Sequence, residues 1–212
     1  MTYDLSRRSL VAALALLPTG ALAQGRATAG LSAADRALVD KAVAYLQTLN
    51  SVKGRFVQTD ARGRTGGGDF FLKRPGKVRF AYDPPNDLLV VSDGSRLMVH
   101  DKRLKTFNAY PLNMSPLSLF LAREIRLDRG VVVTEVRRYA DGFSITARDK
   151  GKETAGQITL VFGDSPMSLR EWTVIDGQGQ RTRVAFSGLQ SASLDNALFI
   201  LRDPRPKAGG KR

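Results

Sequence analysis

Two short segments of alternating side chains, residues 69–74 and 77–82, constrain the fold more than any other part of this sequence. Successive side chains of a strand point to opposite faces. A cation among apolar groups is costly unless its hydrogen bonds are accepted, so an arginine in such a row must reach solvent or meet a dedicated acceptor. One face of this predicted hairpin is an apolar row that contains such a cation, and its members are Phe70, Leu72, Arg74, Val78, Phe80 and Tyr82.

The same period-2 pattern recurs along most of the chain and predicts a mainly β fold of about ten or eleven antiparallel strands. A glycine-rich turn is expected at residues 62–68, and Asp-Gly or Gly-Asp pairs at 141–142, 163–164 and 176–177 indicate further turns. So large a sheet is expected to curl. The other predicted strands are residues 52–60, 88–91, 96–100, 104–109, 130–138, 142–149, 155–162, 167–175 and 180–188.

Two segments break this pattern and predict helices. Residues 33–49 follow Ser32, a plausible N-cap, and carry a broad apolar stripe. Residues 115–122 are apolar nearly all round, with Ser115 as the expected N-cap and Pro116 at the first helical position. Such apolar faces match the concave side of a curled sheet. An open sheet plugged by helices and a closed barrel both satisfy these patterns.

The N-terminus predicts export. Arg7-Arg8 precede a short apolar run, and Ala21-Leu22-Ala23 has the form of a cleavage site, so residues 1–23 are predicted to be a signal peptide. A bacterial periplasm is the expected destination, by either the Sec or the twin-arginine route. One domain is predicted over residues 24–203, followed by a basic disordered tail at 204–212.

Composition narrows the function. The chain has no cysteine and one histidine, His100, which excludes disulfides, thiol chemistry, a cysteine lipid anchor and histidine metal clusters. Gly66-Gly67-Gly68 does not match a phosphate loop, and no serine lies in a nucleophile elbow. No enzyme activity, metal or cofactor is therefore expected. The formal net charge of +13 predicts attraction to anionic surfaces, but an exported chain without a nucleic-acid motif is not expected to bind nucleic acid.

Several short motifs occur in order along residues 35–203, and each alone is weak. They are Phe56-Val57-Gln58, Leu72-Lys73-Arg74-Pro75, Pro85, Val91-Ser92-Asp93-Gly94 with Leu97, Ser115-Pro116-Leu117, Leu121-Ala122-Arg123 and Asp195-Asn196-Ala197-Leu198-Phe199. Their order and spacing, with a signal peptide and no cysteine, resemble the periplasmic outer-membrane lipoprotein carrier family (LolA-like).

This resemblance implies an unclosed antiparallel β-barrel with a helical lid over an apolar cavity. It implies a chaperone that receives lipoproteins from an inner-membrane ATP-driven extractor, shields their acyl chains and passes them to an outer-membrane receptor; a monomer is expected. Arg74 matches the family arginine that hydrogen-bonds lid carbonyls in the empty form and acts as a lid latch, whereas Val78 replaces a family aromatic. The expected lipid-binding residues are Phe56, Phe70, Leu72, Val78, Phe80, Tyr82, Leu97, Leu117 and Phe120.

Two alternatives remain open at the level of sequence. The same fold could carry another exported lipid, such as a phospholipid or a glycolipid. The concave surface could instead bind a protein segment, as in a sensor or adaptor.

Overall fold

The computed structural model describes residues 30–127, 130–151 and 156–204. Contacts divide the chain into two units, Met1–Leu31 and Ser32–Arg212, and the fold below is that of the second. The predicted signal peptide and residues 205–212 of the predicted tail lie outside the described residues. In the described part of the chain, no helix has the length and apolarity needed to cross a membrane.

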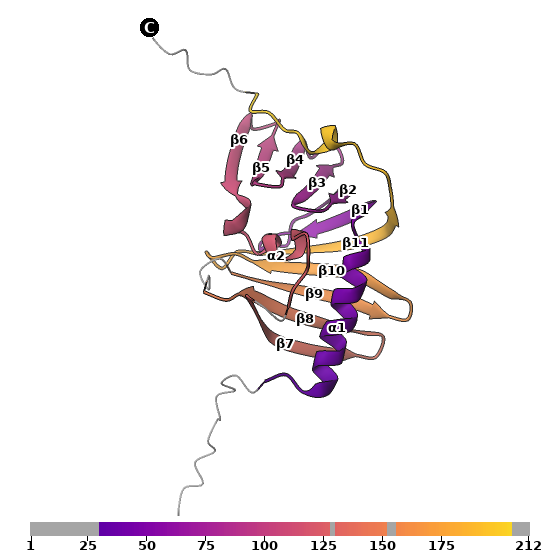
Figure 1. The fold of residues 1–212 in the computed structure, drawn as a ribbon. Coiled ribbons are helices and arrows are strands. Elements are labelled where there is room, and N and C mark those ends of the chain that lie inside the picture. The colour runs from indigo at the N-terminus through magenta and orange to yellow at the C-terminus, as the bar shows by residue number, and fades with distance from the viewer. Residues whose placement is uncertain (1–29, 128–129, 152–155, 205–212) are drawn as a thin grey trace, which may run out of the picture. The chain divides into compact units, whose positions relative to one another are not determined.

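Eleven strands form one antiparallel sheet, which confirms the predicted mainly β fold (Figure 1). Their spatial order is β6-β5-β4-β3-β2-β1-β11-β10-β9-β8-β7, so the first and last strands of the chain pair at the centre. The order ends in two different edge strands, and the barrel is therefore not closed. The strands are β1 (Ser51–Thr59), β2 (Thr65–Lys73), β3 (Lys77–Tyr82), β4 (Leu88–Asp93), β5 (Arg96–Asp101), β6 (Thr106–Pro111), β7 (Val131–Tyr139), β8 (Gly142–Asp149), β9 (Gln157–Asp164), β10 (Met167–Ile175) and β11 (Arg181–Ser191).

The glycines of β2 correct one prediction. Residues 62–68 were expected to form a turn, but β2 begins at Thr65 and pairs Gly66, Gly67 and Gly68 with β1. A Cβ atom at Gly68 would lie 2.0 Å from the carbonyl oxygen of Ala81 on β3. Glycine is therefore used here for a close approach of two strands rather than for a turn.

Helix α1 (Ala33–Thr48) lies across strands β7–β11 in Figure 1. Ser32 is its N-cap, as predicted, because the Asp35 backbone N–H donates to Ser32 Oγ at 3.0 Å. The side chains that α1 buries are Val39, Ala42 and Leu46.

The second helix begins later than predicted. A short 3₁₀ turn, η1 (Leu112–Met114), leads into α2 (Leu117–Leu121), whose N-cap is Pro116. The prediction of Ser115 as the N-cap is therefore wrong by one residue. Ser115 still serves the start of the helix, since its Oγ accepts the Leu117 N–H at 3.3 Å. The fixed φ of a proline ring suits it to this position.

A second hydrophobic core lies on the outer face of the sheet and was not predicted from the sequence. After β11 the chain runs back over β3 and β4 and forms η3 (Asn196–Phe199), seen in yellow in Figure 1. We call residues 192–201 the C-terminal strap. Side chains of the strap and of strands β4–β6 pack into one buried cluster, whose members are Val91, Met98, Phe107, Leu194 and Phe199.

Cationic side chains of β2 and β3 fasten the strap. Lys73 Nζ donates to the Leu194 carbonyl at 2.7 Å, and Arg79 Nη1 donates to the Leu198 carbonyl at 2.9 Å. Lys77 Nζ donates to the side-chain oxygen of Asn196 in the strap at 3.0 Å. These bonds occupy the face opposite the apolar row of the predicted hairpin, because alternate residues of a strand point to opposite sides.

Candidate functional site

Five aromatic side chains meet inside the curl of the sheet. Strand register brings them together, because Phe70 pairs with Phe80 across β2 and β3, and Phe56 with Phe186 across β1 and β11. The ring centroids of Phe56 and Phe80 are 5.0 Å apart, and those of Trp172 and Phe186 are 4.7 Å apart. We call Phe56, Phe70, Phe80, Trp172 and Phe186 the aromatic cluster.

The aromatic cluster fills the interior in this structure. Its members are almost completely buried except Phe186, which is half-buried. Edge-to-face ring pairs of this kind contribute roughly 0.5–1.5 kcal/mol each beyond the area that they bury. An apolar ligand that entered here would have to part these rings, so the interior is a closed and packed state of the site.

The structure brings together most residues that were predicted to bind lipid. Tyr82 and Leu97 are only half-buried. Tyr82 lies against Phe56, donates its hydroxyl to Gln58 at 2.5 Å, and has a pKa that burial raises above its usual value. The seven buried residues are Phe56, Phe70, Leu72, Val78, Phe80, Leu117 and Phe120.

Sequence reasoning missed the part of the site that comes from strands β10 and β11. Trp172 contacts Phe70, Phe80, Phe120 and Phe186, more rings than any predicted residue, yet it was not singled out. The available signal was its place on a period-2 strand as the one tryptophan of the chain. Only the pairing of β1 with β11 carries β10 near β2, and that pairing has no local signature.

Helix α2 covers the aromatic cluster. The Phe120 ring lies 4.8 Å from the Trp172 ring, edge to face. Leu117 and Leu121 are buried beside it, so the short helix is apolar because it faces the interior. The Gly76 N–H donates to the Leu121 carbonyl at 2.7 Å, which joins α2 to the turn between β2 and β3.

Arg74 holds both helices. Its Nε and Nη2 donate to the Phe120 carbonyl of α2 at 3.1 and 2.8 Å, and its Nη1 donates to the Leu46 carbonyl of α1. The guanidinium carbon also lies 4.9 Å from the Phe120 ring centroid. We call this set of contacts the Arg74 tie.

The acceptors of the Arg74 tie belong to the last turns of α1 and α2. Carbonyl groups in the last turn of a helix lack the usual partner four residues ahead, and a cation complements the negative end of the helix dipole. The Leu46 carbonyl also accepts the Leu49 N–H at 3.1 Å, so it is shared between this cap and Arg74. Burial lowers the pKa of Arg74 to about 10. The guanidinium is therefore still charged at neutral pH. Backbone carbonyls accept the hydrogen bonds of this cation at the end of the apolar row.

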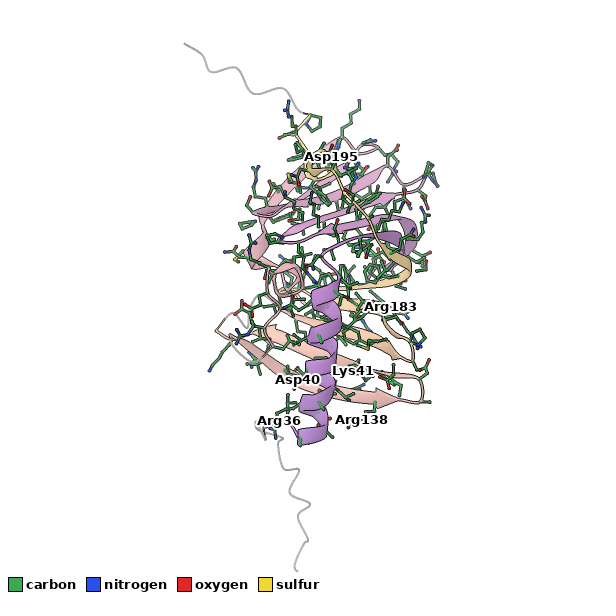
Figure 2. All side chains as sticks on the ribbon, turned by 45° about the vertical axis from the view of Figure 1, so that its right-hand side comes forward. Arg36, Asp40, Lys41, Arg138, Arg183 and Asp195 are labelled. Atoms are coloured by element: carbon green, nitrogen blue, oxygen red, sulfur yellow. The ribbon has the colours of Figure 1, made fainter. Side chains whose placement is uncertain are left out.

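Charged contacts tie the remainder of α1 to the sheet. Arg138 of β7 lies 2.8 Å from Asp35, and Lys41 pairs with Asp164 at the end of β9. Figure 2 shows Lys41 and Arg138 near the N-terminal half of the helix. The hydrogen bond from Ser32 and the charge of Arg138 hold the pKa of Asp35 below its usual value. Water reaches at least one partner of each pair, so each pair contributes little to stability.

Two grooves border helices α1 and α2. One of about 530 Å³ lies between α2 and the β2–β3 turn, and its lining includes Pro75, Gly76 and Leu121. The other, of about 540 Å³, lies between the end of α1 and strands β10 and β11, and its lining includes Leu49 and Phe186. Open space thus adjoins both helices that Arg74 holds, and the second groove reaches the aromatic cluster.

The chemistry of this site is apolar burial. Residues 30–127, 130–151 and 156–204 contain no group of three or more His, Cys, Asp or Glu side chains that could hold a metal ion. The site offers rings and aliphatic side chains around one cation that is itself occupied by backbone carbonyls.

Comparisons with known proteins place the chain in a family. The family model for the outer membrane lipoprotein carrier protein LolA matches residues 47–202. An outer-membrane lipoprotein carrier protein of Xylella fastidiosa is 33% identical over 157 residues, which cover 69% of this chain and 74% of that protein. One from Bordetella avium is 29% identical over 201 residues, or 89% of this chain and 88% of that protein.

A solved LolA superfamily protein from Nitrosomonas europaea aligns with a TM-score of 0.45 at 8% identity, over 76% of this chain and 97% of that chain. The family match and the curated relatives confirm the resemblance inferred from the motifs. The chain belongs to the outer-membrane lipoprotein carrier family.

Proposed function

We propose that this protein is a periplasmic chaperone that shields the acyl chains of lipoproteins and carries them from the inner to the outer membrane. Membership of the carrier family supports the cargo class. The observation that carries the mechanism is the Arg74 tie, which fixes two helices over an aromatic interior through three hydrogen bonds.

Acyl chains need such a shield. Each methylene removed from water is worth about 0.8 kcal/mol, so a lipoprotein with several long chains cannot cross an aqueous space unaided. A cavity that was always open would bind the chains tightly and release them slowly. Here the aromatic cluster fills the interior, and cargo must displace ring–ring contacts.

The Arg74 tie sets the balance between loading and release. Cargo binding requires α1 and α2 to move from the aromatic cluster, which breaks the bonds to Leu46 and Phe120. The free energy of these bonds is subtracted from the affinity for cargo, because a ligand that favours one state must offset the cost of reaching it. Arg74 is thus a lid latch that lets a receptor withdraw the acyl chains.

The partners follow from this role. An ATP-driven extractor in the inner membrane would load the carrier, and an outer-membrane receptor would unload it. The N-terminal segment of residues 1–23 has the sequence of a signal for export to the periplasm. The nine residues predicted to bind lipid, together with Trp172 and Phe186, would line the opened cavity.

The test is identification of the cargo. The tagged full chain is expressed in its native host and purified from the periplasm, and bound molecules are identified by mass spectrometry. Triacylated lipoproteins are expected, with an unrelated periplasmic protein carrying the same tag as the control. Recovery of free phospholipid or glycolipid alone would overturn the lipoprotein cargo, and absence of any apolar ligand would overturn carriage altogether.

A further inference from the structure

The hairpin loop between β5 and β6, residues 102–105, combines three cations with one exposed apolar side chain. Lys102, Arg103 and Lys105 are all exposed, and Leu104 between them is 58% exposed. A large apolar side chain held in water has no folding benefit, and apolar groups among cations are typical of segments that lie at anionic membrane surfaces.

The loop has a fixed backbone. The Leu104 N–H donates to the Asp101 carboxylate at 2.8 Å, and the Lys102 N–H donates to the Asp87 carbonyl at 3.0 Å. Lys105 adopts a positive φ of 53°, which is uncommon for a residue other than glycine. The exposure of Leu104 is therefore a feature of the folded loop.

Other hairpin loops of the sheet lack this combination. The β1–β2 loop pairs Arg64 with Asp60 at 2.7 Å and contains no large apolar residue. The β10–β11 loop, residues 176–180, contains glycine and glutamine after its aspartate and has no cation. The β5–β6 loop thus differs from both of these loops in joining cations to an exposed apolar side chain.

The end of the C-terminal strap lies near the start of β6, which follows this loop. Leu201 packs against the buried cluster that includes Phe107, next to the start of β6, and exposed Arg202 follows it in the chain. Figure 1 shows the yellow end of the strap beside β6. Exposed Asp203 follows Arg202, so the excess of positive charge comes from Lys102, Arg103 and Lys105 of the loop itself, which outnumber the adjacent Asp87 and Asp101.

We propose that the β5–β6 loop docks the protein on bilayers that contain anionic phospholipids. Lys102, Arg103 and Lys105 contact phosphate headgroups, and Leu104 enters the boundary between headgroups and acyl chains. Each cation near an anionic surface raises partitioning about fivefold, and burial of one leucine raises it about tenfold. The docking is a property of the loop itself and goes beyond carriage of cargo.

The test measures co-sedimentation of the purified full chain with vesicles. Vesicles of phosphatidylcholine alone are compared with vesicles that contain phosphatidylglycerol, at low and at physiological salt. Binding is expected only to the anionic vesicles and should weaken as salt rises. Equal binding to both kinds of vesicle, or no binding to anionic vesicles at low salt, would overturn the proposal.

Matched variants assign the binding to the loop. K102E/R103E/K105E should weaken partitioning at least about a hundredfold, because it removes three cations and adds three anions, and L104N should weaken it about tenfold. The control K53E/K150E/R181E makes the same change of charge at exposed sites on β1, the β8–β9 turn and β11. V57N removes another exposed apolar side chain. An equal loss of vesicle binding in the charge control would show that binding depends only on the net charge of the protein. An equal loss in V57N would show that Leu104 has no special part, and either result would contradict the proposal.

Failure of this proposal is distinguishable from failure of the proposed function. Cargo bound to the loop variants is measured by the same mass spectrometry as for the unmodified protein. The loop variants should retain their cargo, since residues 102–105 lie outside the aromatic cluster and the Arg74 tie. Unfolding of a variant is checked by its thermal transition, and L104N alone still tests the loop if the triple variant unfolds.

Discussion

The guanidinium of Arg74 contacts both the backbone carbonyl and the aromatic ring of Phe120. Its Nε and Nη2 donate to the Phe120 carbonyl at 3.1 and 2.8 Å, while its carbon lies 4.9 Å from the centroid of the ring of the same residue. That ring packs on Trp172 at 4.8 Å. One side chain at a strand end thereby controls both the backbone of α2 and the contact that closes the aromatic cluster.

Replacement of this arginine should separate binding from release. Arg74→Leu removes bonds from a charged donor worth about 1.5–3 kcal/mol each, so the opened lid should become at least about tenfold more populated. Lipoprotein should still bind, but its transfer to the outer-membrane receptor should slow by a similar factor. Transfer is measured from purified loaded carrier to receptor. Transfer at the normal rate would contradict the latch.

Two further arginine variants sharpen this experiment. Arg74→Lys keeps the charge but loses the planar fork that reaches two carbonyls, so its transfer rate should lie between those of the parent and Arg74→Leu. Arg79→Leu removes a comparable arginine bond, to the Leu198 carbonyl, on the opposite face. Transfer by Arg79→Leu should stay close to that of the parent.

Trp172 should report the position of the lid. It is 2% exposed, and Phe120 of α2 is one of its four ring contacts. In cargo-free Arg74→Leu, separation of α2 admits water, so the emission of Trp172 should move to longer wavelength and acrylamide should quench it more. Cargo-free Arg79→Leu serves as the control. Unchanged emission in both variants would mean that the lid stays closed without Arg74.

The C-terminal strap should contribute to stability through Phe199. This side chain is 1% exposed in the outer core, whereas its neighbour Ile200 is 60% exposed. Phe199→Ala should lower the free energy of unfolding by about 3–5 kcal/mol through lost burial and the cavity left behind. Ile200→Ala should change it by less than about 0.5 kcal/mol. Urea unfolding followed by circular dichroism measures both, and similar values would refute the assigned packing.

Gly68 should not accept a side chain. A Cβ there would meet the Ala81 carbonyl at 2.0 Å, so Gly68→Ala must push β2 and β3 apart at the place where Tyr82 pairs. A loss of about 1–3 kcal/mol in unfolding free energy is expected from such overpacking. Gly30→Ala is the control, because a Cβ at Gly30 meets nothing within 4 Å. A neutral Gly68→Ala would show that the strands can separate freely.

Much of the sheet could be predicted because strands leave a local signature. Side chains that alternate over residues 70–82 are sufficient to place β2 and β3 and to identify the inward row. The ends of the strands were predicted less exactly than their centres, because strand pairing continues for as long as a neighbouring strand offers hydrogen-bond partners. Gly66 to Gly68 looked like a turn because glycine is common in turns, and their role depends on how closely β3 approaches.

The candidate site could be predicted only in part. The row from Phe70 to Tyr82 supplied residues from neighbouring strands, and Arg74 stood out because a cation in that row required an acceptor. The acceptors themselves, the carbonyls of Leu46 and Phe120, have no signature in sequence because every residue carries a carbonyl. Trp172 is remote in sequence from the predicted row and reaches it through the central β1–β11 pair.

Local patterns in the sequence were sufficient to predict the strands, the two helices and the inward apolar row, because each depends on the side chains of a few neighbouring residues. Contacts in the folded chain decide which strands are edges, that rings from β1–β3 and from β10 and β11 fill the interior, and that residues 192–201 pack on the outer face. These features depend on contacts between residues far apart in the chain. Arg74 illustrates both cases. Its place in the apolar row can be read from neighbouring residues, whereas its hydrogen-bond partners Leu46 and Phe120 are far from it in the chain.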